Sequence, residues 1–290
     1  MTICIIANPE KPTVQEPLLT IIDWAENKGV SIVFDQKLNY FLDGKSYTHV
    51  TTTGGETPAI RACDVVVSVG GDGTMLWAAR RVGNYGKPIL GVNSGRMGFL
   101  ANIQQEKIIE AFNYLIDGKY ELDKRYLLEA TTEHGETFLA FNEFLFSKTG
   151  RASMITLVAR LDDLVINKYW ADGIIVSTPT GSTAYNLSAG GPIVMPETNV
   201  VTLTPISPHT LTTRPLVLPS NKNISITVDP PGQEVLFSND GKICEVEGPL
   251  TFVNIKQSDY TIDLVKLPGQ DYFKTLRNKL MWGADFRERI

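Results

Sequence analysis

The chain has 290 residues, of which 43% are apolar and 20% are charged, and its formal net charge is −5. This composition is that of a soluble globular protein, and the length allows one large domain or two ordinary ones. Because the net charge is negative, the composition gives no sign of a basic surface that would bind nucleic acid. A polyanionic ligand would therefore have to be held by backbone amides, a metal ion or a few local cations.

The start of the chain and its cysteines indicate the cellular setting. Residues 1–9 lack a basic segment and carry a short apolar run, so we expect a first β-strand and not a signal peptide. No apolar stretch approaches the ~18 residues that a membrane span needs. Cys4, Cys63 and Cys244 are widely separated and lack CxxC spacing, which favours buried free thiols over a disulfide or metal site. We expect a cytoplasmic protein without a membrane partner.

The first part of the chain, to about residue 120, alternates predicted strands and helices. Strands are predicted at residues 3–7, 30–34, 64–69 and 88–92, and helices at residues 14–27, 74–82 and 104–116. Residues 45–56, rich in Thr and Gly, are expected to be irregular. Strands that are apolar throughout and alternate with helices indicate a parallel sheet covered on both faces.

From about residue 122 the pattern changes to short β-branched or aromatic segments separated by turn residues. Strands are predicted at residues 127–132, 137–147, 156–161, 164–169, 174–177, 223–228, 236–238, 250–256 and 260–265. This indicates an all-β domain. Residues 272–280 are predicted to form a helix that packs back on the first domain. The expected fold is thus α/β plus all-β: a Rossmann-like parallel-sheet domain (1–122 with 268–290) followed by a β-sandwich-like domain (123–267).

A Gly-Gly-Asp-Gly-Thr motif at residues 70–74 follows a predicted buried strand and opens the next helix. Open α/β sheets bind ligands at such positions, and glycines with a helix N-terminus favour a phosphate. An acid in this loop, Asp72, would repel phosphate unless it binds a metal or takes a proton from an attacking hydroxyl. The structural alternative is a tight turn with Asp72 as the helix N-cap.

A second loop, rich in hydroxyls and containing Gly181, follows the strand predicted at residues 174–177. Small residues let backbone N–H groups approach a ligand, hydroxyls supply donors and acceptors, and Tyr185 could stack on a base. Together the two loops predict a nucleotide site with one carboxylate at its centre.

Other polar features leave their roles open. The segment at residues 93–99 follows the next strand and should lie beside the first loop, where Arg96 could bind phosphate or be a surface residue. Asn142 and Glu143 interrupt an apolar segment, and a ribose, a base edge or a structural network could supply their partners. His209, among prolines, favours a structural role, and Asp240 begins a hairpin turn signal. GxGxxG, HExxH and metal-spaced Cys or His clusters are missing, so the metal ligands are unknown.

These motifs and their spacing resemble those of the NAD kinase family over most of the chain. The matching segments are Gly-Gly-Asp-Gly-Thr at residues 70–74, Asn142-Glu143, Thr-Pro-Thr-Gly-Ser-Thr-Ala-Tyr at 178–185, and residues 187–192, 208–209 and 214–217. Diacylglycerol and sphingosine kinases and phosphofructokinases carry close variants of the first motif. The block at residues 178–185, joined to Asn-Glu at this spacing, is specific.

The resemblance implies a kinase that transfers the γ-phosphate of ATP to the 2′-hydroxyl of the adenosine ribose of NAD, making NADP. It also implies assistance by Mg²⁺, assembly as a homodimer or homotetramer, and Asp72 as the general base. The implied phosphate and ATP contacts are Gly70, Gly71, Gly73, Thr74 and Asn93. The implied NAD contacts are Asp72, Gly73, Asn142, Glu143, Asp172, Thr183, Ala184, Tyr185, Asn186, Leu187, Ser188 and Lys242.

Two residues depart from the family pattern. Trp77 stands where many relatives have a basic or polar residue near the ligand, and Lys242 stands where many have Gln. Lys242 could bind phosphate, or shift the preference between donors or between NAD and NADH. The alternatives are a lipid kinase of the diacylglycerol kinase-like class and a non-catalytic NAD- or NADP-binding sensor. No basic amphipathic helix is evident for a lipid surface, and a pure binder gains little from Asp72.

Overall fold

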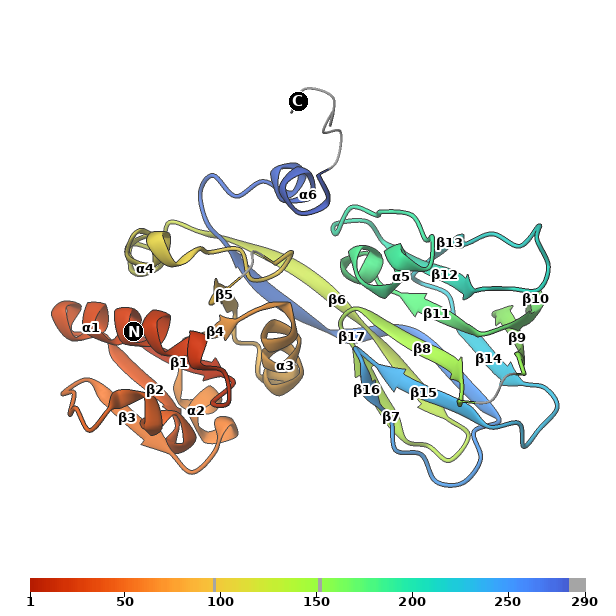
Figure 1. Ribbon diagram of the computed structural model, residues 1–290, viewed down its shortest axis with the longest axis horizontal. Helices are drawn as coiled ribbons and strands as arrows, with labels where there is room; N and C mark the ends of the chain where they lie inside the picture. Colours follow the sequence, from red (N-terminus) through yellow and green to blue (C-terminus); the bar gives the residue numbers. More distant parts are fainter. Residues whose placement is uncertain (96–97, 151–152, 282–290) are drawn as a thin grey trace. The chain divides into compact units, whose positions relative to one another are not determined.

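The computed structural model describes residues 1–95, 98–150 and 153–281 and divides into two compact units (Figure 1). The first unit comprises Met1–Lys124 and Ile262–Ile290, and the second comprises Arg125–Thr261. Arg96, a candidate phosphate contact, lies outside the described residues. In the described part of the chain, no helix is long and apolar enough to cross a membrane.

A parallel sheet of strand order β3-β2-β1-β4-β5 forms the centre of the first unit. Its strands are Thr2–Ala7 (β1), Ser31–Asp35 (β2), Val50–Thr53 (β3), Val65–Gly70 (β4) and Ile89–Asn93 (β5). Every residue of β4 and β5 is buried, as expected for central strands with both faces covered. The end of β17 (Phe252–Lys266) adds to this sheet, where Leu264 pairs in parallel with Ile89.

Helices cover both faces of this sheet (Figure 1). One face carries α1 (Gln15–Lys28) and α4 (Ile108–Ile116), and the other carries α2 (Glu56–Ala62) and α3 (Asp72–Val82). The rings of Trp24 in α1 and Phe112 in α4 pack edge-on with centroids 5.1 Å apart. A further helix, α6 (Tyr272–Leu280), begins after Asp271, whose carboxylate accepts the Phe273 N–H. Short 3₁₀ segments are Pro12–Val14 (η1), Gln36–Leu42 (η2), Gly83–Tyr85 (η3) and Gln105–Lys107 (η4).

The second unit contains two β-sheets that share one core. The first sheet has the order β13-β12-β11-β8-β15-β16, and every pairing in it is antiparallel. Its strands are Glu143–Lys148 (β8), Gly173–Ser177 (β11), Val200–Ile206 (β12), Leu216–Pro219 (β13), Val235–Asn239 (β15) and Lys242–Ile243 (β16). Phe144 and Phe146 of β8 stack on Phe237 of β15 with centroids 5.5 and 4.9 Å apart.

The other sheet of this unit continues the core. It contains Glu121–Thr132 (β6), Thr137–Ala140 (β7), Ile155–Leu161 (β9), Leu164–Ala171 (β10), Ile224–Val228 (β14) and β17. Leu128, Leu157 and Ile226 of this sheet are buried in the same cluster as the phenylalanines of the first. The predicted fold class, a parallel α/β domain with a separate antiparallel β domain and a C-terminal helix, is confirmed.

Several predicted boundaries differ from the structure. Residues 45–56, expected to be irregular, contain β3, which is largely exposed and therefore lacks an apolar run. The segment predicted as one strand at 137–147 is two strands, β7 and β8, and the two segments at 250–256 and 260–265 are the single strand β17. Neither β12 nor β13 is among the predicted strands. Strand β13 pairs only with residues 200–203 of β12, so the rest of β12 is an edge of the sheet. Pro205 lies in this edge part, where a residue without an N–H group is tolerated.

Candidate active site

The Gly-Gly-Asp-Gly-Thr segment connects β4 to α3 at the carboxyl end of the parallel sheet. Gly70 ends β4, and a Cβ there would lie 2.2 Å from Oγ1 of Thr74, so glycine is required. A Cβ at Gly71 or Gly73 would meet no atom within 4 Å. These two glycines therefore leave open space beside the first N–H groups of α3, where a helix N-terminus favours an anion.

Backbone donors fix the half-buried Asp72 carboxylate in one position. Its Oδ1 accepts the N–H groups of Leu100 (2.9 Å) and Ala101 (3.1 Å), and its Oδ2 accepts the N–H of Phe99 (2.9 Å). A Cβ at Gly98 would lie 2.0 Å from Oδ1, so this approach requires glycine. The N-cap of α3 is Gly71, which rules out the simple N-cap role for Asp72. A carboxylate has about four acceptor positions. Donors among the described residues fill three of them, which leaves one position on Oδ2 for a ligand or a proton.

The loop that holds Asp72 is tied to β5. The Asn93 N–H donates to the carbonyl of Ile103 (2.8 Å), and Nδ2 of Asn93 donates to the carbonyl of Ala101 (3.2 Å). Its Oδ1 accepts the N–H of Gly95 (2.6 Å). A Cβ at Gly91 would lie 2.9 Å from Cα of Ala101, so this glycine makes room for the loop. Asn93 therefore positions the Asp72 loop.

In the second unit, Asn142 and Glu143 lie at the start of β8, and Asp240 holds their backbone. The Asp240 carboxylate accepts the N–H groups of Phe141 (3.0 Å), Asn142 (2.7 Å) and Glu143 (3.2 Å). Asp240 and Gly241 have φ values of 45° and 76°, which form the predicted hairpin turn between β15 and β16. Asp240 thus makes the turn and also fixes the Asn-Glu pair, a second role that the turn signal does not reveal.

Glu143 is a buried carboxyl with an unpartnered oxygen. Among the described residues, nothing forms a hydrogen bond with its Oε2. Burial, with a smaller contribution from the negative charge of Asp240, raises the pKa of Glu143 to about 8. At neutral pH this side chain is therefore protonated and can donate a hydrogen bond to a ligand.

Glu143 makes the stability of the fold depend on pH. Its pKa rises from the ordinary 4.5 to about 8 in the folded protein, so its stabilising contribution is full below pH 4.5 and lost as pH rises through about 8. We expect the Tm of the wild type to fall more steeply from about pH 6 to about pH 9 than that of Glu143→Gln, which does not titrate. Thermal unfolding followed by circular dichroism measures both slopes. Equal slopes would contradict the elevated pKa.

The hydroxyl-rich loop after β11 packs against the Asn-Glu pair. It contains Thr180–Thr183 (η5) and Tyr185–Ser188 (α5). Oγ1 of Thr178 donates to the carbonyl of Phe141 (2.7 Å) and accepts the N–H of Gly181 (3.0 Å). A Cβ at Gly181 would lie 2.3 Å from the carbonyl oxygen of Asn142. The structure therefore brings together two motifs that lie far apart in the sequence.

Asn186, an implied NAD contact, points into the core of this unit. Its Nδ2 donates to the carbonyls of Ser182 and Pro192, both at 3.2 Å. Its Oδ1 accepts the hydroxyls of Thr202 (3.1 Å) and Thr204 (2.6 Å). The side chain is fully buried and its four hydrogen-bonding positions are filled. Asn186 therefore shapes the loop, while Tyr185 beside it is 44% exposed and open to a ligand.

Asp172 and Lys242 lie at the edges of this arrangement. Asp172 precedes β11, at the end of the strand opposite Ser177, about 17 Å along the chain. Its Oδ1 lies 2.7 Å from Nζ of Lys148. Lys242 is exposed and opens β16, directly after the Asp240 turn. The structure therefore keeps Lys242 near the Asn-Glu pair and separates Asp172 from it.

The remaining polar candidates have structural surroundings. The His209 ring packs on Trp170 with centroids 4.2 Å apart, and the His209 N–H donates to the carbonyl of Trp170 (2.9 Å). Cys4, Cys63 and Cys244 are buried and free, as predicted. A hydrogen bond in which the Cys4 thiol donates to Cys63, together with burial, raises the pKa of Cys4, and the same hydrogen bond lowers the pKa of Cys63.

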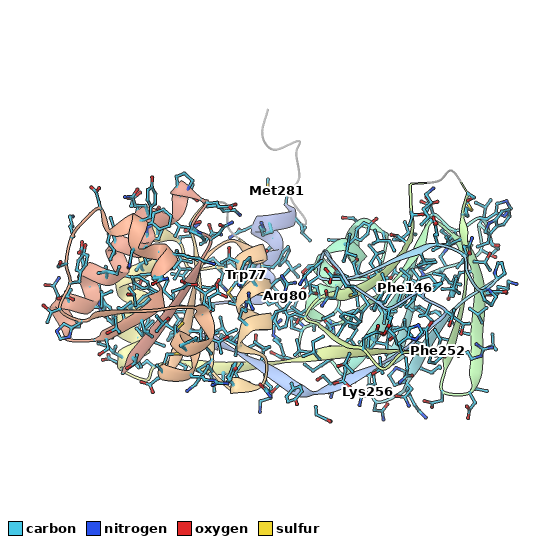
Figure 2. All side chains as sticks on the ribbon, turned by 90° about the horizontal axis from the view of Figure 1, so that it is seen from below. Trp77, Arg80, Phe146, Phe252, Lys256 and Met281 are labelled. Atoms are coloured by element: carbon cyan, nitrogen blue, oxygen red, sulfur yellow. The ribbon has the colours of Figure 1, made fainter. Side chains whose placement is uncertain are left out.

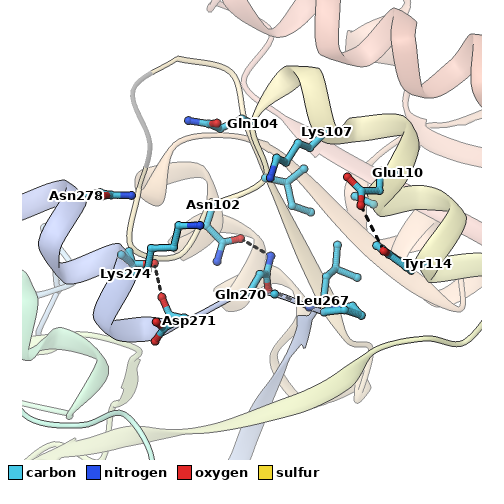
Figure 3. A pocket seen from close by; sticks show the side chains of 15 residues that line it. Asn102, Gln104, Lys107, Glu110, Tyr114, Leu267, Gln270, Asp271, Lys274 and Asn278 are labelled. Carbon is cyan, nitrogen blue, oxygen red and sulfur yellow. Dashed lines mark hydrogen bonds between the residues drawn. The ribbon is translucent and has the colours of Figure 1, made fainter.

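A pocket in the first unit lies beside α4 and α6 (Figure 3). It has a volume of about 200 Å³ and is lined by residues near α4 and α6, among them Lys107 and Lys274. Nε2 of Gln270 donates to Oδ1 of Asn102 (2.9 Å) across its wall. None of the residues implied to bind NAD or ATP lines this pocket.

Metal binding is limited by the ligands available. Within the described ranges, no group of three or more His, Cys, Asp or Glu side chains could hold a metal ion. Mg²⁺ is commonly held by one or two carboxylates together with substrate phosphates and water. Asp72, with one acceptor position left, fits an ion that arrives with a nucleotide and does not fit a closed protein cage.

An open α/β sheet whose carboxyl edge offers glycines, a helix N-terminus and one fixed carboxylate has the parts of a phosphoryl-transfer enzyme. The ATP-NAD kinase N-terminal domain matches residues 3–120, and the ATP-NAD kinase C-terminal domain matches residues 141–267. The NAD kinase of Flavobacterium johnsoniae is 45% identical over 229 residues, 77% of this chain and 78% of that protein. The NAD kinase of Bacteroides fragilis (strain ATCC 25285) is 35% identical over 290 residues, 99% of this chain and 100% of that protein. This chain belongs to the NAD kinase family.

Solved structures agree with this assignment. Yeast NADH kinase complexed with NADH has a TM-score of 0.91 at 26% identity, covering 99% of this chain and 89% of the yeast chain. The fold also matches an Archaeoglobus fulgidus NAD kinase in complex with ATP, with a TM-score of 0.74 at 23% identity over 97% of this chain and 98% of the other. The chain is an enzyme that phosphorylates NAD with ATP, as the sequence motifs predict, and the lipid kinase and sensor alternatives are not favoured.

Proposed function

We propose that Asp72 is the general base that accepts the proton of the 2′-hydroxyl on the adenosine ribose of NAD as the γ-phosphate of ATP is transferred to it. The supporting observation is a carboxylate fixed by three backbone N–H groups with one acceptor position left, at the first turn of α3. A ribose hydroxyl is a weak nucleophile at neutral pH, and positioned proton transfer contributes ~10²–10⁴-fold. The reaction needs no covalent intermediate.

Residues 70–74 would bind the phosphates of ATP. The open space at Gly71 and Gly73 supports close approach of phosphate oxygens to the helix N-terminus. The domain that binds ATP is then the α/β domain of residues 1–122 with 268–290. Asn93 would contribute by holding the loop that carries the Asp72 donors.

The β domain of residues 123–267 would bind NAD. Asn142 and the protonated Glu143 supply polar groups, and Tyr185 supplies an exposed ring that can pack on a base. Residues 183–188 would form one wall of the NAD site. The Asn186 side chain would hold this segment in place through its hydrogen bonds in the core. Asp172 would contact a part of the extended dinucleotide that is remote from Glu143. Lys242 would contact a part that lies beside the Asp240 turn.

Assembly and location complete the proposal. Leu164 and Val165, on the edge strand β10, are 74% and 59% exposed, and an apolar edge of this kind favours burial against another chain. This supports a homodimer or homotetramer. Free buried thiols support a cytoplasmic location.

Mg²⁺ is expected to act as part of the Mg·ATP substrate, neutralising phosphate charge. Removing divalent ions with EDTA should therefore abolish NADP formation and leave the Tm of the nucleotide-free protein unchanged. Activity should return when Mg²⁺ is added in excess. A large drop in Tm with EDTA alone would instead indicate a resident structural metal.

The acceptor hydroxyl can be tested with analogues of NAD. With Mg·ATP, NAD and an analogue lacking the adenosine 3′-hydroxyl should be phosphorylated, whereas 2′-deoxy-NAD should act only as a competitive inhibitor. Product is detected by ³¹P NMR, and the NAD product also by an NADP-specific dehydrogenase. Phosphorylation of 2′-deoxy-NAD would contradict the proposed position of transfer.

A further inference from the structure

Helix α3 presents an exposed stripe that begins at the phosphate loop. Gly73, Trp77, Arg80 and Arg81 are exposed and follow a spacing of three to four residues, so they share one face of the helix. Figure 2 labels Trp77 and Arg80 on this helix. The Trp77 side chain is 46% exposed on this face, although tryptophan is highly buried on average.

The Trp77 indole is held in place despite its exposure. Its Nε1 donates to Oε2 of Glu56, at the start of α2 (2.9 Å). Nε of Arg81 lies 2.9 Å from the same oxygen, and the Arg81 guanidinium carbon lies 5.6 Å from the centre of the Trp77 ring. One carboxylate thus orders both side chains and fixes the plane of the indole. A ring ordered before a ligand arrives loses little entropy on binding.

Trp77 lies one helical turn after the phosphate loop, on the same exposed face of α3 as Gly73. Side chains on an α-helix tilt toward the N-terminus, so the Trp77 side chain leans toward the turn that contains Gly73. The two Cα atoms are separated by about 6 Å along the helix axis. Gly73 contributes no side chain, and a Cβ there would meet no atom within 4 Å. The surface between Trp77 and the N-terminus of α3 is therefore unobstructed at Gly73.

We propose that Trp77 is the platform on which the nucleobase of the phosphoryl donor stacks, which makes it a specificity-determining residue for the donor. The inference rests on the proposed binding of the donor phosphates at residues 70–74, because a base attached to those phosphates extends to within reach of a ring one turn along α3. We assign Trp77 to the donor and not to NAD for one reason. The NAD contacts proposed above, apart from Asp72 and Gly73, lie in the other unit.

Stacking on an indole sets a particular pattern of donor preference. Every base has a π-face, so stacking favours nucleoside triphosphates over inorganic polyphosphate without selecting one base by its edges. ATP and GTP are then comparable donors, and tripolyphosphate, the same phosphate chain without a base, is weaker. The loss of one base–aromatic stack corresponds to about 5- to 150-fold in affinity.

The test compares the wild type with Trp77→Ala and Trp77→Phe in NADP formation. Trp77→Ala should raise KM for Mg·ATP by about 5- to 150-fold and leave KM for NAD within about twofold, and Trp77→Phe, which keeps a ring, should recover most of the loss. The inhibition constant of tripolyphosphate against ATP should not change in either variant. Tyr40→Ala, which removes an 82% exposed ring elsewhere in the same unit, is the matched control and should behave as the wild type.

Each contrary result has its own meaning. An unchanged KM for ATP in Trp77→Ala overturns the stacking role, as does an equal loss of tripolyphosphate affinity, since that indicates a disturbed phosphate loop. A rise in KM for NAD alone assigns the ring to the acceptor and also overturns the proposal. A wild type that makes no NADP from ATP contradicts the proposed function instead. In that case fluorescence still decides the stacking role: ATP, and not tripolyphosphate, should quench a signal that Trp77→Phe lacks.

Discussion

Replacing Asp72 with Asn is expected to lower kcat by about 10²–10⁴-fold while the Kd for NAD changes little. The amide has nearly the same shape as the carboxylate but cannot accept a proton. The effect should appear in kcat, because the lost interaction belongs to the transition state and not to the bound substrates. Steady-state kinetics in a coupled assay and calorimetric titration with NAD measure the two quantities separately. A kcat close to that of the wild type would remove Asp72 from the mechanism.

The surroundings of Asp72 call for a second variant. In Asp72→Asn the amide nitrogen must face at least one of the backbone donors that now bind the carboxylate, so the loop could shift. Gly98→Ala keeps the carboxylate but places a Cβ 2.0 Å from Oδ1, so it should also lower kcat by displacing the base. Gly54→Ala is the matched control, because a Cβ there meets no atom within 4 Å, and its kcat should equal that of the wild type. Normal kcat in Gly98→Ala would show that the position of Asp72 is not critical.

Replacing Asp240 with Asn is expected to raise KM for NAD by at least about tenfold and to destabilise the protein by about 1–3 kcal/mol. The carboxylate now accepts three N–H groups from residues 141–143, and an amide can satisfy only part of that set. The backbone of Asn142 and Glu143 should therefore shift or loosen. Loss of the negative charge should also lower the pKa of Glu143, although burial keeps it above the ordinary value.

Asp240→Ala separates the turn from the hydrogen bonds. Asn tolerates the left-handed conformation at φ 45°, whereas Ala does not, so Asp240→Ala should lose more stability than Asp240→Asn. Chemical denaturation and steady-state kinetics give the two readings. If both variants keep the wild-type KM for NAD and only Asp240→Ala loses stability, Asp240 is only a turn residue. The turn signal in the sequence would then describe the whole role of Asp240.

Features of this protein that depend on local sequence could be predicted, whereas features that depend on contacts between distant segments could not. The buried strands β4 and β5 and the helix α6 are visible in the sequence because local periodicity determines them. The exposed strand β3 lacks such a signal. Contacts between distant segments are likewise hidden: Asp240 binds the N–H of Asn142 across 98 positions, and Asp72 binds the N–H of Ala101 across 29.

Motif matching also leaves the direction of a side chain undetermined. Asn186 lies in the Asn-Leu-Ser segment implied to bind NAD, yet its amide faces Thr202 and Thr204 in the core. Only the three-dimensional pairing of β12 with β11 places those hydroxyls there. Trp77 illustrates the same limit, because its sequence position does not reveal that Glu56 at the start of α2 accepts its indole N–H.

Transfer of ³²P from [γ-³²P]ATP to NAD by the purified protein, with Asp72→Asn assayed beside it, is the decisive measurement of NAD phosphorylation with Asp72 as the base. We expect ATP-dependent, Mg²⁺-dependent labelling of a product that an NADP-specific dehydrogenase reduces, with labelling at least about 100-fold slower in the variant. Absence of labelled NADP from folded wild-type protein that binds NAD and ATP would contradict it.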